Sequence, residues 1–258
     1  MGRGLSRLLA VAANTFRETV RERVLYNLVF FALVMTGAGL LLGQLSIRQE
    51  EKIIKDIGLA AMDLFGTLIA VFIGVGLVSK EIERRSLYPL LAKPLTRDEL
   101  YLGKFAGLCF TLLVNVSVMT GGLYLTLLAT GKKADPLLLA AAYPILLGLA
   151  LVVAIAMLFS TLTSSTLAAV LTVGVVIAGR FADVVRNLRE VAPAVPVWLV
   201  RLLYGILPNF RNFDLKDRVA YGDPLPGAVL GFVTLYAAAY VTVLLVLGLL
   251  SFRSREFQ

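Results

Sequence analysis

Six long apolar runs, separated by short polar breaks, follow one another along the chain. They cover about Val24–Gln44, Ile57–Ser79, Lys104–Thr130, Leu137–Phe159, Thr166–Ala182 and Pro224–Leu250. A helix that crosses a membrane needs about 20 mainly apolar residues, which each of these runs approaches or exceeds. The pattern predicts an all-α integral membrane protein, with six transmembrane helices in a single domain over residues 1–258.

The composition agrees with this class and excludes several kinds of chemistry. Hydrophobic residues make up 59% of the 258 residues and charged residues 16%, whereas soluble domains average about 45–50% and about 25%. There is no histidine, and Cys109 is the single cysteine, so a haem, a His-based metal site and an intrachain disulfide are not expected. We therefore expect no cofactor or metal in this chain. The basic residues flank the spans without forming a stripe, so we also expect no nucleic-acid partner.

Residues 3–22 have an apolar face and a basic face at helical spacing. The apolar positions are Leu5, Leu8, Leu9, Ala12, Phe16 and Val20. A basic amphipathic helix of this kind lies in the headgroup plane, so we predict an interfacial helix over residues 1–23. It can serve as a topology anchor alone, or it can also contact a partner.

Six spans place both termini on the same side of the membrane. Basic residues are divided almost evenly, with 13 on the side of the termini and 12 on the other. The first span usually dominates orientation, and five arginines in residues 1–23 precede it, against three basic residues in 45–56. The charge pattern therefore favours cytoplasmic termini.

Two polar residues within the spans are candidates for an intramembrane polar site, Asp63 and Asn115. Ionisable residues inside a span are functional candidates by default, but Asp63 is expected in the first two turns of its span and can reach the interface. Asn115 shares its span with Ser117, Gly121 and Gly122, which together also suit close helix packing. Both interpretations stay open for each residue.

The only long segment outside the membrane is residues 183–223, which we expect on the extracytoplasmic side. Pro193 and Pro196 precede an apolar stripe from Trp198 to Ile206, which predicts a helix lying on the membrane surface. A loop over residues 207–214 is expected to follow. At other breaks we expect a charged loop over 46–56, an uncharged break over 160–165, an Arg180 that snorkels outward and a basic tail over 252–257.

Residues 80–104 form a charged, proline-punctuated island between the second and third spans. Thr96 and Glu99 have the spacing of a capping box, and Asp98 adds negative charge at the same helix start. A helix should therefore begin near Arg97 and continue into the third span. Pro94 disfavours helix at Lys93, which predicts a turn there.

The first half of the island predicts a short transverse helix over residues 87–92, with Ser86 as its N-cap. It would present four large apolar side chains, Leu87, Tyr88, Leu90 and Leu91. An apolar face with a charged rim is typical of a docking surface. The alternative is a loop whose apolar side chains dip into the headgroups.

This island resembles the signature segment of the ABC type-2 exporter permeases, the membrane subunits of ATP-binding-cassette exporters. The resemblance rests on Glu81, Glu83, Arg85, Ser86, Leu87, Leu90, Leu91, Ala92, Pro94, Leu95, Arg97, Glu99, Leu100, Gly103 and Lys104. The six-span layout, the N-terminal amphipathic helix, the Ser/Thr-rich break and the long outer segment are similar too. The sequence departs from the pattern at Ser86, where threonine is common.

The resemblance implies a dimer of permease subunits, homodimeric or pseudo-dimeric, bound to two ATPase subunits that carry ATP and magnesium. It also implies that the loop between spans two and three is a cytoplasmic coupling helix in contact with the ATPase. The ATPase-coupling residues would be Glu81, Glu83, Arg84, Arg85, Leu87, Tyr88, Leu90, Leu91, Lys93, Pro94 and Arg97. The sequence itself has no Gly-x-x-x-x-Gly-Lys-Ser/Thr motif, so ATP is expected on the partner.

The leading hypothesis is thus a non-enzymatic permease subunit of an ATP-driven exporter. It would be a multi-pass protein of the cell inner membrane, surrounded by lipid, and residues 183–223 could meet an extracytoplasmic partner. A second hypothesis keeps the ATPase coupling but moves no solute, as in a force-transmitting complex. A third is an intramembrane enzyme, for which Asp63 alone would have to supply the chemistry.

Overall fold

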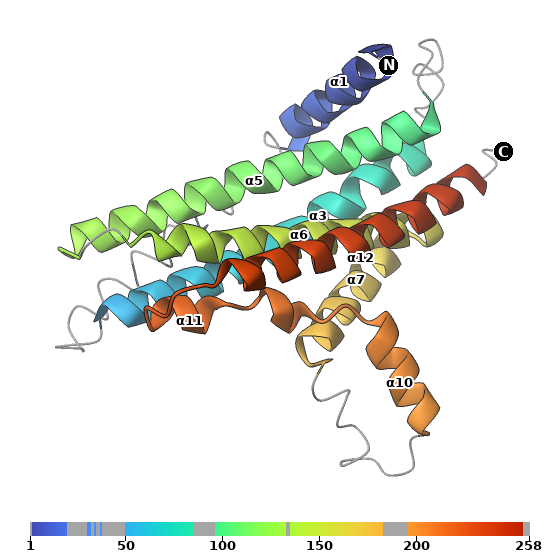
Figure 1. Ribbon diagram of the computed structural model, residues 1–258. Coiled ribbons are helices and arrows are strands. Elements are labelled where there is room, and N and C mark those ends of the chain that lie inside the picture. Colours follow the sequence, from blue (N-terminus) through green and yellow to red (C-terminus); the bar gives the residue numbers. More distant parts are fainter. Residues whose placement is uncertain are drawn as a thin grey trace.

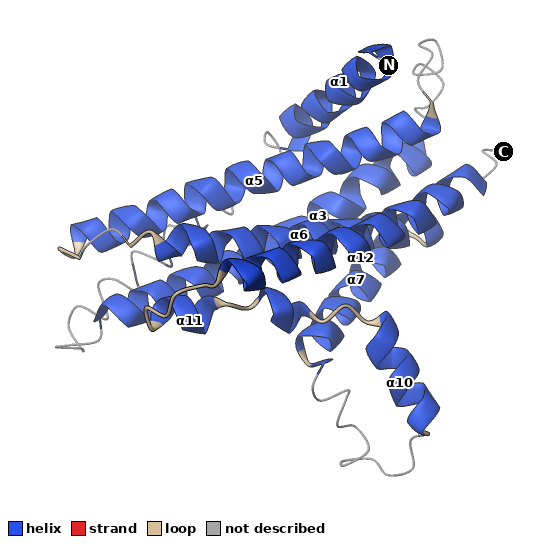
Figure 2. Cartoon of the chain, in the orientation of Figure 1, coloured by secondary structure: helices blue, strands red, loops and turns tan. Residues whose placement is uncertain are grey.

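The computed structural model describes residues 2–19, 30, 31, 34, 37, 50–84, 96–132, 135–182 and 196–254. In these residues every regular element is a helix and no strand occurs (Figure 2), which confirms the all-α prediction. The elements, labelled as in Figure 1, are α1 Gly2–Thr19, α3 Glu50–Arg84, α5 Arg97–Ala129, α6 Leu137–Leu162, α7 Ser165–Arg180, α10 Val197–Ile206, the 3-10 helix η2 Phe210–Phe213, α11 Lys216–Ala220 and α12 Gly227–Ser254.

Four of the described helices are long and apolar enough to cross a membrane. They are Glu51–Gly76, Arg97–Ala129, Leu137–Leu162 and Gly227–Arg253, which correspond to the predicted second, third, fourth and sixth spans. The predicted fifth span is the apolar helix α7, whose 16 residues extend about 24 Å, less than the ~30 Å of a hydrocarbon core. Most of the first span lies outside the described residues. Six spans therefore stay a prediction.

Helix α6 is the centre of the bundle. It packs against α3, α5, α7 and α12, and its residues 151–157 are buried without interruption. A helix that is apolar on every side is stable when other helices surround it, and α6 has no charged residue over its whole length. Figure 1 shows the chain ends marked N and C at the same end of this bundle, with α11 near the opposite end and α10 projecting from the side.

Helix α3 begins earlier than the sequence suggested, because its first charges are neutralised. The predicted loop over residues 46–56 is wrong for its second half, since the helix starts at Glu50. Lys55 is almost fully buried, and its Nζ lies 2.7 Å from Glu51 and 2.6 Å from Asp135. Burial alone would raise the pKa of the Asp135 carboxyl, but hydrogen bonds from Lys55 and the Leu137 amide outweigh it and hold that pKa below its usual value. These pairs make a charged helix start compatible with packing.

Two other predicted boundaries also move outward. Helix α6 continues to Leu162 through the predicted break, because Ser160 Oγ donates to the Val75 carbonyl at 3.3 Å and Thr161 Oγ1 to that of Leu158 at 2.7 Å. The predicted tail after Leu250 is helical to Ser254, and Phe252 is buried beside Tyr101 with 5.8 Å between ring centroids.

Helix α1 packs along α5 through two glycines. A Cβ at Gly103 would lie 2.8 Å from Val11 Cβ, and one at Gly107 would lie 2.6 Å from the Ala12 carbonyl oxygen. Phe16 extends the contact with an edge-on ring at 4.8 Å from Phe110. The amphipathic helix therefore has a protein neighbour, while its location in the headgroup plane stays a prediction.

Of the two glycines predicted to serve packing within α5, Gly122 lies next to Phe31 of the predicted first span, most of which lies outside the described residues. A Cβ at Gly121 would meet nothing within 4 Å among the described residues, and one at Gly122 would meet only Phe31, at 3.7 Å. Among the described residues, the closest approaches to glycines of α5 occur at Gly103 and Gly107, which face α1.

The α1–α5 contact gives a matched pair of glycine substitutions. Gly107→Ala should weaken the packing of α1 on α5 by about 1–3 kcal/mol, since the new methyl group meets a backbone oxygen that cannot rotate away. Gly121→Ala, on the same helix and facing open space, should be neutral or slightly stabilising. Thermal unfolding in detergent and the rate of proteolysis within α1 measure the difference. Equal behaviour of the two variants would contradict the packing described here.

Candidate functional site

The candidate site is built around Asp63, which lies near the middle of the apolar stretch Glu51–Gly76. The sequence placed it in the first two turns of a span that begins at Ile57; because α3 starts at Glu50, Asp63 lies in the fourth turn of the helix, and its depth in the membrane stays a prediction. An ionisable group at that position is costly in lipid unless the protein supplies partners.

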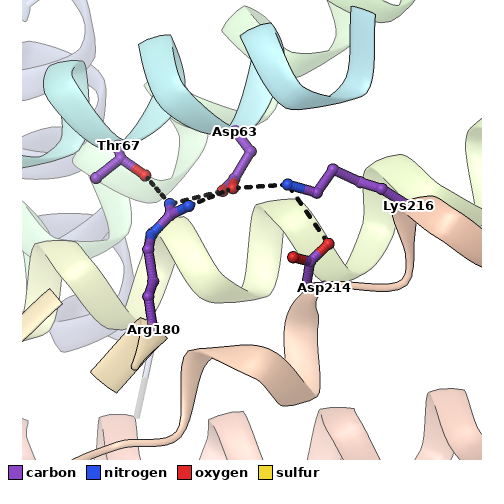
Figure 3. A network of polar contacts seen from close by, with 5 residues as sticks. All are labelled: Asp63, Thr67, Arg180, Asp214 and Lys216. Carbon is purple, nitrogen blue, oxygen red and sulfur yellow. Dashed lines mark hydrogen bonds and ion pairs between the residues drawn. The ribbon is translucent and has the colours of Figure 1, made fainter. Parts of the chain in front are cut away.

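Arg180, the last residue of α7, provides the main partner (Figure 3). Its Nη1 donates to Asp63 Oδ2 at 2.8 Å and its Nη2 to Asp63 Oδ1 at 3.1 Å, a two-bond pairing of guanidinium and carboxylate. The same Nη2 donates to Thr67 Oγ1, one turn along α3, at 3.0 Å. Arg180 thus turns onto α3, which corrects the prediction that it snorkels outward.

A second cation comes from the segment between α10 and α12. Lys216 Nζ lies 3.4 Å from Asp63 Oδ2 and 3.4 Å from Asp214 Oδ1 (Figure 3). Both distances are longer than those to Arg180, so these are looser ion pairs. The network therefore connects α3, α7 and the chain that leads into α12.

A small cavity of about 90 Å³ opens beside this network. One side carries charged groups, including Asp63, Arg180 and Lys216, and the other is formed by apolar residues of α6. A water molecule occupies about 30 Å³ of liquid, so the space suits a few waters rather than a large substrate. Because both oxygens of Asp63 already accept hydrogen bonds from a cation, the arrangement fits a structural ion pair better than a general acid or base.

Two aromatic side chains hold the same segment against the bundle. Phe210 and Phe213 are 7% and 5% exposed, although the sequence predicted a loop over residues 207–214. A Cβ at Gly179 would overlap the ring of Phe210, and one at Gly148 would lie 3.4 Å from Phe213. These glycines create the room for the two rings, so residues 210–213 pack as part of the bundle.

Asn115, the other predicted polar residue, stands apart from this site. It is 1% exposed on α5, and neither its oxygen nor its nitrogen has a hydrogen-bond partner among the described residues. It is not one of the residues that line the cavity beside Asp63. The structure therefore does not bring the two candidates together.

Most of the predicted ATPase-coupling residues lie outside the described part of the chain. This applies to Arg85, Leu87, Tyr88, Leu90, Leu91, Lys93 and Pro94, and only the helical backbone is described for Glu81, Glu83 and Arg84. Arg97 is described as the first residue of α5, and its Nη1 donates to the Arg253 carbonyl at 3.3 Å.

The predicted capping box at the start of α5 is confirmed. Thr96 Oγ1 accepts a hydrogen bond from the Glu99 amide at 3.2 Å, and the Thr96 amide donates to Glu99 Oε2 at 3.1 Å. Asp98, in the same turn, forms an ion pair with Arg253 near the end of α12. The end of the island is therefore fixed to a second helix.

Sequence reasoning found Asp63 but missed its neighbours. Lys216 and Asp214 carried no signal, because they are more than 150 residues away along the chain and their segment looked like a loop. Thr67 was detectable in principle, since it lies one helical turn after Asp63 on the same face.

A double-mutant cycle tests the central ion pair. Arg180→Gln should lower the free energy of unfolding by about 1–3 kcal/mol, between the values for exposed and buried pairs, because Asp63 is left with one loose partner. Asp63→Asn with Arg180→Gln should cost less than the sum of the single changes. Unfolding in detergent measures each variant, with Arg218→Gln on the exposed side of α11 as the matched control. Additive losses would show that the two side chains do not interact.

Comparison with known proteins places the chain in a family. No curated protein matches the sequence. Residues 9–257, nearly the whole chain, match the profile of the family described as ABC-2 family transporter protein. The chain therefore belongs to the ABC-2 transporter family, as the island between spans two and three indicated, and it is a membrane component of an ABC transporter and not itself catalytic.

Proposed function

We propose that this protein is the permease subunit of an ATP-driven exporter and that it receives force from a separate ATPase through residues 80–104. Family membership supports the transporter role, and the missing nucleotide-binding motif in the sequence supports a separate ATPase. ATP and magnesium would bind to that partner. The observation that carries the proposal is the construction of the first turn of α5.

Three helices meet where the proposed coupling region ends. The capping box gives α5 a defined first residue, Arg97, within the last part of the island. Asp98 and Arg97 bind Arg253 of α12, and the Glu99 carboxylate lies close to Gly4 of α1. A displacement of the island would therefore move α5 and also pull on α1 and α12.

Contacts one turn further along α5 strengthen this connection. Tyr101 is buried, and its hydroxyl lies so close to Gly248 of α12 that a Cβ there would overlap it. Such tight packing does not deform gradually, so motion of α5 is expected to move α12 as a body.

The proposed assembly follows from the family and from the surface of the helices. Leu64, Leu68 and Phe72 form an exposed apolar stripe on α3, which a bilayer or a second permease subunit would cover. We propose a homodimer or pseudo-dimer in the cell inner membrane, with cytoplasmic termini and with residues 183–223 available to an extracytoplasmic partner. Glu81, Glu83, Arg84, Arg85, Leu87, Tyr88, Leu90, Leu91, Lys93, Pro94 and Arg97 would form the ATPase-coupling surface.

The intramembrane-enzyme hypothesis has less support. Asp63, the acid on which it depended, is engaged by Arg180 and Lys216, and the described residues hold no group of acidic or cysteine side chains that could bind a metal ion. A catalytic carboxylate would have to leave both partners before acting.

Co-purification tests the docking step. The tagged permease should retain its ATPase partner, whereas Arg85→Glu with Leu91→Asp should reduce binding by about tenfold or more, because one change reverses a rim charge and the other puts a carboxylate on the apolar face. A control with the same two types of change, Arg218→Glu in α11 and Ile206→Asp in α10, alters exposed residues outside the island. This variant should bind the ATPase partner normally. Full binding by the island variant would refute docking at this surface.

Reconstitution separates export from force transmission. Proteoliposomes with both subunits should hydrolyse ATP and release or accumulate a solute in a manner that depends on the intact island. ATP hydrolysis that responds to the permease, with no solute movement for any cargo tested, would favour the force-transmitting complex.

A further inference from the structure

We propose that residues 208–220, which we call the strap, form a movable closure on the distal half of the bundle and that Asp63 is the residue that latches it. The strap comprises η2 and α11 and is seated on α3, α6 and α7. In Figure 1 it runs along the bundle between α10 and the start of α12, on the half away from the marked chain ends. The proposal rests on the transport role above.

The strap is attached at few points. Its apolar anchors are Phe210, Phe213 and Val219. Its polar ones include the Lys216 ion pair with Asp63 and the Asn209 amide, which donates to the Tyr236 hydroxyl of α12 at 2.7 Å. Both helical pieces of the strap are a single turn or little more, with 4 and 5 residues. Elements this short depend on their anchors, because an isolated helix of that length is not stable.

The chemistry of the latch suits an interface that separates. Packed apolar residues would hold a permanent contact as well as or better than a buried ion pair. Once water enters, however, separated charges are solvated at little cost, whereas separated apolar faces are not. Lys216 is the looser partner of Asp63, at 3.4 Å, while Arg180 binds the same carboxylate through two shorter bonds. Release of the strap would therefore leave the Asp63–Arg180 pair intact within the bundle.

The surroundings of the strap allow movement. The cavity of about 90 Å³ lies beneath it, between the strap and the apolar residues of α6, so water can enter on that side. At the far end Gly222 has a φ of 77°, a conformation that glycine adopts readily, and it connects α11 to the residues before α12. Displacement would uncover Gly148 and Gly179, where the two rings now fit.

Cysteine labelling measures the closure directly, because Cys109 is the single cysteine of the chain. In a Cys109→Ala background, Phe213→Cys is the reporter in every protein compared, so that the loss of this one anchor is common to all of them. Asp63→Asn then removes the latch charge without changing the size of the side chain. The full chain in lipid nanodiscs is treated with a membrane-impermeant maleimide. Loss of the latch should speed labelling at position 213 by roughly tenfold, as expected when one partly buried ion pair no longer favours the closed state.

Matched variants separate release of the strap from general loosening. Asp56→Asn, an exposed acid on the same helix, should leave the rate at position 213 unchanged. Thr111→Cys, fully buried on α5, should stay slow in the Asp63→Asn protein, and Asp223→Cys, exposed beyond the strap, should react quickly in every background. An unchanged rate at position 213, or an equal increase at positions 111 and 213, would overturn the latch.

The same labelling with and without nucleotide tests the latch and the ATP-driven coupling separately. With the ATPase partner bound, ATP and vanadate should raise labelling at position 213 in the wild-type latch background. If Asp63→Asn frees the strap but nucleotide has no effect, the latch stands and ATP-driven coupling fails. If nucleotide frees the strap but Asp63→Asn has no effect, coupling stands and Asp63 is not the latch.

Discussion

The burial of α6, most complete at residues 151–157, is the constraint on which the rest of the bundle depends. A helix without a charged residue is unfavourable in water, and α3, α5, α7 and α12 pack around it. Their positions around α6 bring together residues that are far apart in the chain. The charged groups of those outer helices then have to find partners among themselves, since neither α6, which has no charged residue, nor lipid offers an opposite charge.

The charges inside the bundle are gathered at few places for this reason. Lys55 pairs with Glu51 and Asp135 near the start of α3, and Asp63 pairs with Arg180 further along the same helix. At the opposite end, on the exposed surface, Asp98 pairs with Arg253. Except for Glu51 and Lys55, which share α3, each pair joins two elements that are not consecutive in the chain. Charge compensation and the assembly of the bundle are thus one and the same requirement.

The sequence was informative wherever the controlling forces are local. Apolar runs predicted the helices α3, α5, α6 and α12, and the Thr96–Glu99 spacing predicted the first turn of α5. Helix ends were less predictable, because Glu51 and Lys55 looked like loop residues, and only the fold brings Asp135, 80 residues away in the chain, into an ion pair with Lys55. The partners of Asp63 were out of reach for the same reason, and Gly103 and Gly107 could not be distinguished from Gly121 without knowing which face met α1. Pair formation across the fold depends on the three-dimensional arrangement that the pattern alone does not contain.

The difference in length between α5 and α7 has a consequence for the surrounding lipid. The uncharged part of α5, residues 105–129, extends about 38 Å, whereas the 16-residue α7 extends about 24 Å. A bilayer adapts to a short apolar surface by thinning and to a long one by thickening or by tilting of the helix. The surfaces formed by α5 and by α7 therefore match bilayers of different hydrocarbon thickness. Membrane composition therefore affects the two helices in opposite ways: a thicker bilayer strains the protein at α7, and a thinner one strains it at α5.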